Sequence, residues 1–223
     1  MKFFVLYWHP EPQSFCSSLF KATLATLKAA GHDVKTSDLH AMKFNPVSGP
    51  HNFKEIKNKD FFKQQAEEAH AVAHDGFVDE LKQEQEKLAW CDVLIVHFPL
   101  WWSGLPAMLK GWCDRVLASG VSYGNGKFFA DGVYKGKRVI LTLTTGGPAP
   151  GYVPGGWMGD INGILRPIHR GVFEFCGFSV LKPHIAYSVA DSDDAGRREL
   201  LAQWTARVAN LGAEDAIDVG PFA

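Results

Sequence analysis

The chain alternates short apolar runs with longer amphipathic segments. The clearest runs, each long enough for one strand, cover residues 2–7, 91–100, 137–145 and 178–189, and a weaker extended pattern covers 32–39. The run at 91–100, "CDVLIVHFPL", is almost continuously apolar. Such a run is typical of a strand that is buried on both faces of a parallel sheet.

Between these runs, apolar residues recur at helical spacing. Ser14 precedes the first such segment, at the position of an N-cap, and Gly31 follows it as a stop signal. Three more helical patterns begin near Phe77, Leu105 and Leu200. Strands that alternate with helices predict βαβ units, and therefore an α/β fold whose parallel sheet has helices on both faces.

One segment breaks this alternation. From about residue 41 to 75 the chain mixes polar and apolar residues without a firm period. Connections of this length inside a compact domain usually have a functional or partner-binding role. We expect a single domain over residues 1–223, in which 41–75 is a long insertion with helix pieces and a subunit contact.

Composition narrows the choice of partners. The formal net charge is −1, so the chain lacks the positive charge that attracts nucleic acid or anionic lipid. No apolar run approaches the roughly 18 residues of a membrane span. The four cysteines stand far apart without a Cys-x-x-Cys pair, which predicts buried, reduced thiols and no metal site. We expect a cytoplasmic protein that binds a small molecule and neither nucleic acid nor the membrane interior.

Three unusual loops follow the expected strands and are the candidates for chemistry. They are "HPEPQSF" (9–15), "PLWWSGLP" (99–106) and the glycine- and proline-rich "TTGGPAPGYVPGGWMGD" (144–160). In open parallel sheets, ligands bind beyond the carboxyl ends of the strands, which is where these loops begin.

The first two loops each allow a structural and a functional interpretation. Ser14 either caps the following helix or binds a phosphate at the helix N-terminus, and His9 either serves a turn or faces the ligand. Trp101 and Trp102 either fill the core, as large aromatic residues usually do, or flank a ligand at the end of a strand.

The third loop also allows two interpretations. Gly146 and Gly147 let backbone N–H groups approach a flat polar ligand, or they belong to a long turn that the neighbouring prolines set. The familiar nucleotide and hydrolase motifs are absent: "GNGKFF" (124–129) is only a broken Gly-x-Gly, and neither a P-loop nor a Gly-x-Ser-x-Gly elbow occurs.

The stretch "FPLWWSGLPAMLKGWCDRVL" (98–117) resembles the NAD(P)H:quinone oxidoreductases, the DT-diaphorase family of flavodoxin-like flavoproteins. The likeness extends in order along most of the chain, through 9–15, 37–46, 144–147, 159–162 and 175–183. It implies a doubly wound, five-stranded parallel sheet in the order 2-1-3-4-5 with flavin at its switch point. It also implies a homodimer with substrate sites at the interface.

The resemblance also assigns roles to residues. The cofactor-binding positions are His9, Ser14, Phe15, Pro99, Leu100, Trp101, Trp102, Ser103, Thr144, Thr145, Gly146, Gly147, Tyr152 and Arg197. Of these, Tyr152 and Gly147 are the catalytic pair beside flavin N1 and O2, and Arg197 near the adenosine half favours FAD over FMN. The substrate-binding positions are Trp102, Ser103, Tyr123, Asn125 and Met158.

The chain departs from this family at three of these positions. Met158 stands where the mammalian members have a histidine that is proposed to stabilise charge on the reduced flavin. Ser103 replaces a bulky aromatic residue at the floor of the substrate site, and Asn125 replaces one of two tyrosines. These exchanges leave the acceptor open, as a quinone or a related compound.

The resemblance implies a two-electron, ping-pong reductase. NADH or NADPH gives a hydride to flavin N5 and leaves, and a quinone then takes its place and accepts the hydride. One rival is a one-electron carrier of the same fold, but the net charge of −1 argues against the acidic docking face that such a carrier needs. The other rival is a flavin-binding regulatory subunit of a membrane ion transporter.

Overall fold

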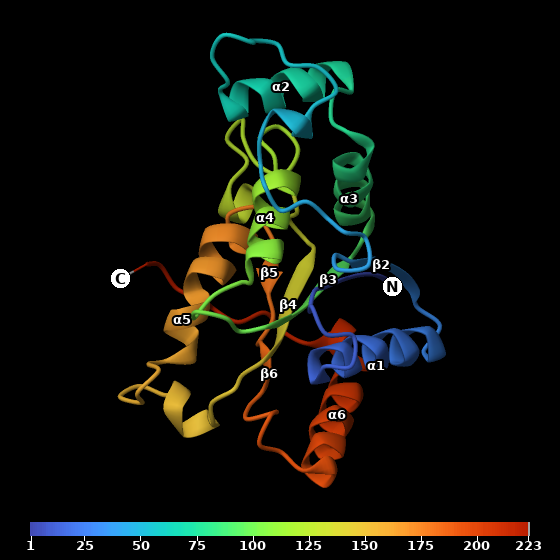
Figure 1. Cartoon of the computed structure of the whole chain (residues 1–223), viewed down its shortest axis with the longest axis vertical. Helices are drawn as coiled ribbons and strands as arrows, with labels where there is room; N and C mark the ends of the chain where they lie inside the picture. Colours follow the sequence, from blue (N-terminus) through green and yellow to red (C-terminus); the bar gives the residue numbers. More distant parts are fainter. Residues whose placement is uncertain (223) are drawn as a thin grey trace.

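A computed structural model describes residues 1–222 as a parallel sheet with helices on both of its faces (Figure 1). The strands are β1 (Lys2–Tyr7), β2 (Asp33–Asp38), β3 (Val93–Pro99), β4 (Arg138–Thr144), β5 (Ser179–Val180) and β6 (His184–Ala186). They lie in the order β2-β1-β3-β4-β5, with β6 also paired to β4, and every pair is parallel. The expected α/β fold and strand order are confirmed.

Six helices cover the sheet and the insertion. They are α1 (Phe15–Ala29), α2 (Gln64–His74), α3 (Asp79–Trp90), α4 (Ala107–Val116), α5 (Ile161–Ile168) and α6 (Asp194–Val208). The cores on the two faces follow the twofold alternation of strand side chains. Phe3 and Val5 of β1 pack with α1 and α6, whereas Phe4 and Leu6 pack with α3, α4 and α5.

The expected last strand at 178–189 is broken into two pieces. Pro183 lacks an N–H group, so the ladder cannot continue through it. Arg207 of α6 donates hydrogen bonds to the carbonyls of Lys182 and Pro183, which the strand no longer uses. As a result β5 and β6 pair with β4 at separate positions, and only three residues of β6 hold the later piece.

The insertion at 41–75 contains a short 3-10 turn (Pro50–Asn52) and helix α2, which Figure 1 shows at the opposite end of the molecule from α6. The buried guanidinium of Arg115 on α4 holds it, because Nε donates to Asn52 Oδ1 at 2.7 Å. Gly111 of α4 lies directly against Pro46, where a Cβ atom would come within 2.1 Å of the carbonyl oxygen. These contacts fasten the insertion to α4.

In the part of the chain that the structure describes, no helix is both long and apolar enough to cross a membrane. Cys16, Cys91, Cys113 and Cys176 are buried and free, as the sequence predicted. Within residues 1–222, no three histidine, cysteine or acidic side chains are grouped so that they could hold a metal ion.

Three histidines in this fold make stability depend on pH. Burial lowers the pKa of His97 to about 3 and the pKa of His169 and His184 to about 4, and the neighbouring His184 adds to the effect on His97. In the unfolded chain a histidine has its ordinary pKa near 6.5, so below that pH the unfolded state takes up protons that the folded state does not.

The free energy of unfolding should therefore fall as the pH drops from about 6.5 towards 4, by about 2 kcal/mol for each of these histidines at pH 5. Urea unfolding at a series of pH values from 7.5 to 4.5 measures this slope. His169→Gln should remove about one third of the pH-dependent loss of stability. His74→Gln, on the exposed side of α2, is the matched control that should leave this loss unchanged. A stability that stays constant over this range would contradict the prediction.

Candidate functional site

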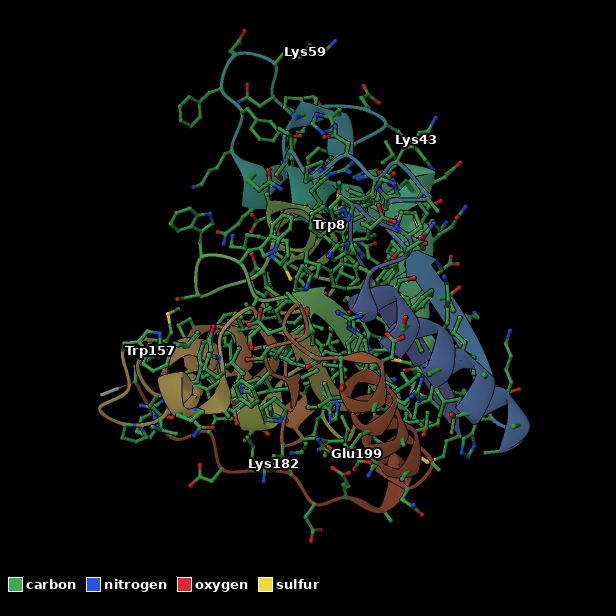
Figure 2. All side chains as sticks on the ribbon, turned by 60° about the horizontal axis from the view of Figure 1, so that its bottom comes forward. Trp8, Lys43, Lys59, Trp157, Lys182 and Glu199 are labelled. Atoms are coloured by element: carbon green, nitrogen blue, oxygen red, sulfur yellow. The ribbon has the colours of Figure 1, made fainter. Side chains whose placement is uncertain are left out.

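Three loops meet at the carboxyl edge of the sheet, after β1, β3 and β4. The register pairs Pro99, the last residue of β3, with Thr144, the last residue of β4. The Leu100 N–H then donates to the Thr144 carbonyl at 2.9 Å, so the second and third loops leave the sheet together. The loop after β4 is gold at the lower left of Figure 1, and Figure 2 labels Trp157 on its outer part.

The first loop leads directly into the N-terminus of α1. Ser14 is the N-cap, and its Oγ accepts a hydrogen bond from the Ser17 N–H at 3.1 Å. His9 Nδ1 accepts from the Glu11 N–H at 2.9 Å, and burial lowers the pKa of His9, so a neutral imidazole faces this loop. The structural interpretation of both residues thus holds, and the dipole of α1 still presents its positive end here.

The second loop is a tight turn from Trp101 to Gly104. Their backbones exchange hydrogen bonds, of which Gly104 N–H to Trp101 O measures 3.0 Å. Trp102 and Ser103 between them have φ values of 50° and 54°. Two consecutive left-handed residues other than glycine are unfavourable, and they hold the Trp102 indole fully exposed. The turn thus presents the Trp102 indole to solvent directly after the carboxyl end of β3.

Aromatic contacts join the first two loops. The Trp8 and Trp101 rings meet edge to face at 5.2 Å, and the His9 and Trp101 rings lie 6.4 Å apart. The Trp8 Nε1–H group is buried and has no hydrogen-bond partner among the described residues. The junction of the two loops therefore carries an unused hydrogen-bond donor.

The third loop is held by one of its own side chains and by the backbone that follows β6. Thr145 Oγ1 donates to the Gly147 carbonyl at 2.8 Å, and the Ser188 N–H donates to the same oxygen at 3.2 Å. A Cβ atom on Gly147 would lie 3.3 Å from the ring of Tyr152, whereas one on Gly146 would meet nothing within 4 Å. Gly147 thus lets Tyr152 approach the backbone, and the backbone at Gly146 borders open space.

Two other glycines of this loop serve the packing of the loop on itself. A Cβ atom on Gly151 would lie 2.7 Å from the Trp157 ring, and one on Gly156 would lie 2.5 Å from the Gly151 carbonyl oxygen. The long-turn interpretation is therefore correct for this part of the loop. The ligand-facing interpretation stays a prediction for Gly146 and Gly147.

Arg197 and Phe15 lie together although they are far apart in the sequence. Both line a cavity of about 370 Å³ between α1 and the first turn of α6, with Gln13, Ser18 and Val189. The guanidinium of Arg197 donates to the Val189 carbonyl at 3.3 Å and lies 3.6 Å from Asp194. A cationic cavity thus lies beside the N-terminal turn of α1.

The five expected substrate residues do not come together within one chain. Met158 lies in the third loop, where its N–H donates to the Gly151 carbonyl at 2.9 Å. Tyr123 instead packs against Phe175 at 5.5 Å and accepts a hydrogen bond from Gln65 of α2. Figure 1 shows α2 and the chain segment after α4 at the end of the molecule opposite the gold loop. Tyr123 and its exposed neighbour Asn125 are thus separated from Met158 in the same chain.

Tyr187 is one residue of this region that the sequence analysis did not single out. It follows β6, and its ring lies 5.6 Å from the ring of Tyr152. Burial raises the pKa of Tyr187, and Tyr152 and Asp160 add to the effect. The rule that ligands bind at strand ends applies to β6 too, but the broken strand hid its end in the sequence.

Comparison with known proteins agrees with this arrangement. A family model described as a flavodoxin-like fold matches residues 1–208. The chain is 36% identical over 221 residues to ribosyldihydronicotinamide dehydrogenase [quinone] of Mus musculus, which covers 99% of this chain and 96% of the mouse protein. It is 35% identical over 218 residues to NAD(P)H dehydrogenase [quinone] 1 of Cavia porcellus, covering 97% and 79% of the two chains.

A solved structure gives the same result. The crystal structure of a Klebsiella pneumoniae protein, provisionally assigned as a quinone reductase, superimposes with a TM-score of 0.94 at 35% identity, over 97% of this chain and 87% of that one. Both the fold and the identity extend along nearly the whole length of these relatives. This chain therefore belongs to the family of flavodoxin-like NAD(P)H:quinone oxidoreductases.

Proposed function

We propose that this chain is a flavin-dependent reductase that passes two electrons, as a hydride, from NAD(P)H to a quinone or a similar small acceptor in a ping-pong cycle. The observation that carries the proposal is the convergence of the exposed Trp102 turn with the Gly146–Gly147 backbone at the paired ends of β3 and β4. A flat aromatic face and a row of backbone groups lie there at one edge of the sheet.

The residues present fit a flavin. Its tricyclic ring needs an apolar flank and a polar edge, and the tryptophan turn and the open backbone at Gly146 provide them. Its phosphate suits the N-terminus of α1 behind Ser14. Bound flavin supplies the redox chemistry, because its N5 atom accepts and donates a hydride.

The role of the chain is to stabilise negative charge at the pyrimidine edge of the ring. N–H groups of Gly146 and Gly147 and the hydroxyl of Tyr152 can donate hydrogen bonds there. Such donors stabilise a developing anion best when they are fixed in advance and shielded from water. The Tyr152 ring is buried and is held between Gly147 and Tyr187, so its hydroxyl is fixed in advance.

FAD suits this site better than FMN. The cavity of about 370 Å³ lies beside the first turn of α1, the proposed phosphate position, and has Arg197 in its wall. FMN ends at its phosphate and would leave that cavity unused. The second phosphate and the adenosine of FAD would enter it, near the cation.

A homodimer would complete the substrate site. Trp102 is fully exposed in the single chain, and Tyr123 accepts a hydrogen bond from Gln65 of α2, which Figure 1 shows at the end of the molecule opposite the gold loop. A second copy can bring Tyr123 and Asn125 over the Trp102 turn of the first. Ser103 and Met158 would then border the acceptor from the flavin side, and the small serine would leave room for acceptors larger than a simple quinone.

An anaerobic titration tests the proposed function. Purified, flavin-loaded protein should be bleached directly by two electrons from NADPH or NADH, and menadione should restore the oxidised spectrum. The names of the relatives differ in the donor, so ribosyldihydronicotinamide belongs in the same series. A stable one-electron-reduced state would favour the carrier, and a flavin that none of the donors reduces would favour the regulatory subunit.

Tyr152→Phe should slow reduction of the bound flavin by about ten- to a hundredfold, at roughly 1.4 kcal/mol of lost transition-state stabilisation per tenfold. The variant keeps the ring against Gly147 and removes only the hydroxyl. Stopped-flow bleaching in a single turnover measures the rate. Tyr187→Phe is the matched control, whose rate should stay within about twofold of wild type. An unchanged rate in Tyr152→Phe would remove this hydroxyl from the mechanism.

Arg197→Ala should weaken FAD binding by about tenfold, or about 1.4 kcal/mol, and should leave FMN binding unchanged. Titration calorimetry of the flavin-free protein with each cofactor measures both affinities. Arg198→Ala is the control, because Arg198 is exposed on the same helix and does not line the cavity. Equal losses for FAD and FMN would mean that Arg197 acts on the fold and does not contact the adenosine half.

A further inference from the structure

Three polar side chains lie side by side in the core beneath α1 and α6. The strand register places His97 of β3 opposite Thr142 of β4, and Thr142 opposite His184 of β6. Paired residues on neighbouring parallel strands are about 5 Å apart and point to the same face of the sheet. His97, Thr142 and His184 therefore form one continuous polar row across three strands.

Each member of the row has one buried side-chain atom without a hydrogen-bond partner among the described residues. These atoms are His97 Nδ1, Thr142 Oγ1 and His184 Nε2. A buried polar atom that makes no hydrogen bond destabilises the fold, because it has lost its bonds to water. Three such atoms at adjacent positions need a shared explanation.

Thr23 Oγ1 engages one nitrogen of His97. It lies 3.0 Å from His97 Nε2 and 2.8 Å from the Leu19 carbonyl, and it accepts a hydrogen bond from Trp204 Nε1 at 2.7 Å. The one hydroxyl hydrogen of Thr23 can point to the Leu19 carbonyl or to His97 Nε2, so the contact fits either tautomer of His97. In both tautomers Nδ1 is the ring nitrogen that has no partner among the described residues.

Aromatic rings enclose the row. Trp204 lies 4.7 Å from the His184 ring and meets the His97 ring edge to face at 5.7 Å. Phe20 stacks on Tyr7 at 4.5 Å and closes the other side, with its centroid 6.2 Å from that of His97. Because Thr23 also holds the imidazole of His97, this ring cannot turn to find another partner.

We propose that His97 Nδ1, Thr142 Oγ1 and His184 Nε2 form a binding site for internal water. A water molecule can donate two hydrogen bonds and accept two, so one molecule can bond His97 Nδ1 in either tautomer and both neighbours as well. Burial keeps both histidines neutral near pH 7, so the ligand that fits is a neutral donor and acceptor.

The position of this water gives it a structural role. β6 has three residues and is separated from β5 by Pro183, so its hold on β4 is short. The Thr145 N–H donates to the Ala186 carbonyl at 3.0 Å, which ties the glycine loop to β6. Internal water between Thr142 and His184 fastens β6 to β4 directly below that loop. This inference concerns the apoprotein and does not depend on the proposed function.

The variant Thr142→Val tests whether the row binds water, because the thermal midpoint of unfolding should change in opposite directions for a hydrated and a dry row. If water is bound, the loss of the hydroxyl removes one of its partners, and the thermal midpoint should fall by about 2 to 4 °C. If the row is dry, the same change replaces an unsatisfied buried hydroxyl with a methyl group, and the midpoint should rise. A rise, or no change, overturns the proposal.

Two variants serve as controls for this measurement. Thr36 is exposed on the edge strand β2, so Thr36→Val measures the effect of the same exchange on strand propensity alone. Thr23→Val removes a hydroxyl with known partners inside the chain and should lower the midpoint in either case.

A crystal structure of the unchanged protein at high resolution tests the site without any variant. The expected result is an ordered water oxygen 2.7 to 3.2 Å from His97 Nδ1 and within hydrogen-bond distance of Thr142 Oγ1. Direct contact between these side chains would overturn the proposal. An ion about 2.0 to 2.1 Å from both histidine nitrogens would overturn it in favour of a metal site.

Discussion

The site depends on the register between β3 and β4. All seven residues of β3 pair with the seven residues of β4, and β3 is buried along its whole length. Because side chains alternate between the faces, a slip of one residue would move the side chains of each face into the core on the other face. Both strands would still be buried. The slip would also separate Pro99 from Thr144, from which the tryptophan turn and the glycine loop start. One ladder therefore determines both the packing and the position of the loops.

The sequence predicted most of the fold because its strongest signals are local. β1, β3 and β4 are apolar on both faces, and α1 has its cap at Ser14 and its stop at Gly31. The break between β5 and β6 had a local signal in Pro183, which the apolar run 178–189 masked, whereas the support from Arg207 is distant in the sequence and could not be seen there. α5 was missed because it has eight residues and contains Pro167, which sequence rules take as the end of a helix.

The candidate site was predictable to the level of loops and no further. The strand-end rule found the three loops, and the structure brings two of them into contact through Trp101. The rule says nothing about which glycines serve the loop itself, and only the packing of Gly151 against Trp157 shows it. Nor can local sequence place Tyr123 far from the glycine loop, because α2 in the insertion holds Tyr123 there.

Polar residues inside doubly buried strands are easy to overlook in a hydropathy pattern. His97 and Thr142 interrupt two apolar runs. Taken alone, each could be read as a single polar residue that the core tolerates. The register shows that they are neighbours and that His184 extends them across a strand that sequence analysis treated as continuous. A polar side chain on a strand that is buried on both faces needs a hydrogen-bond partner from outside its own strand, because the hydrogen bonds of the sheet use only backbone atoms. For His97, Thr23 is that partner at Nε2, and Trp204 in turn donates to Thr23. The other ring nitrogen, Nδ1, has no partner among the described residues, and this is the atom at which we propose the water.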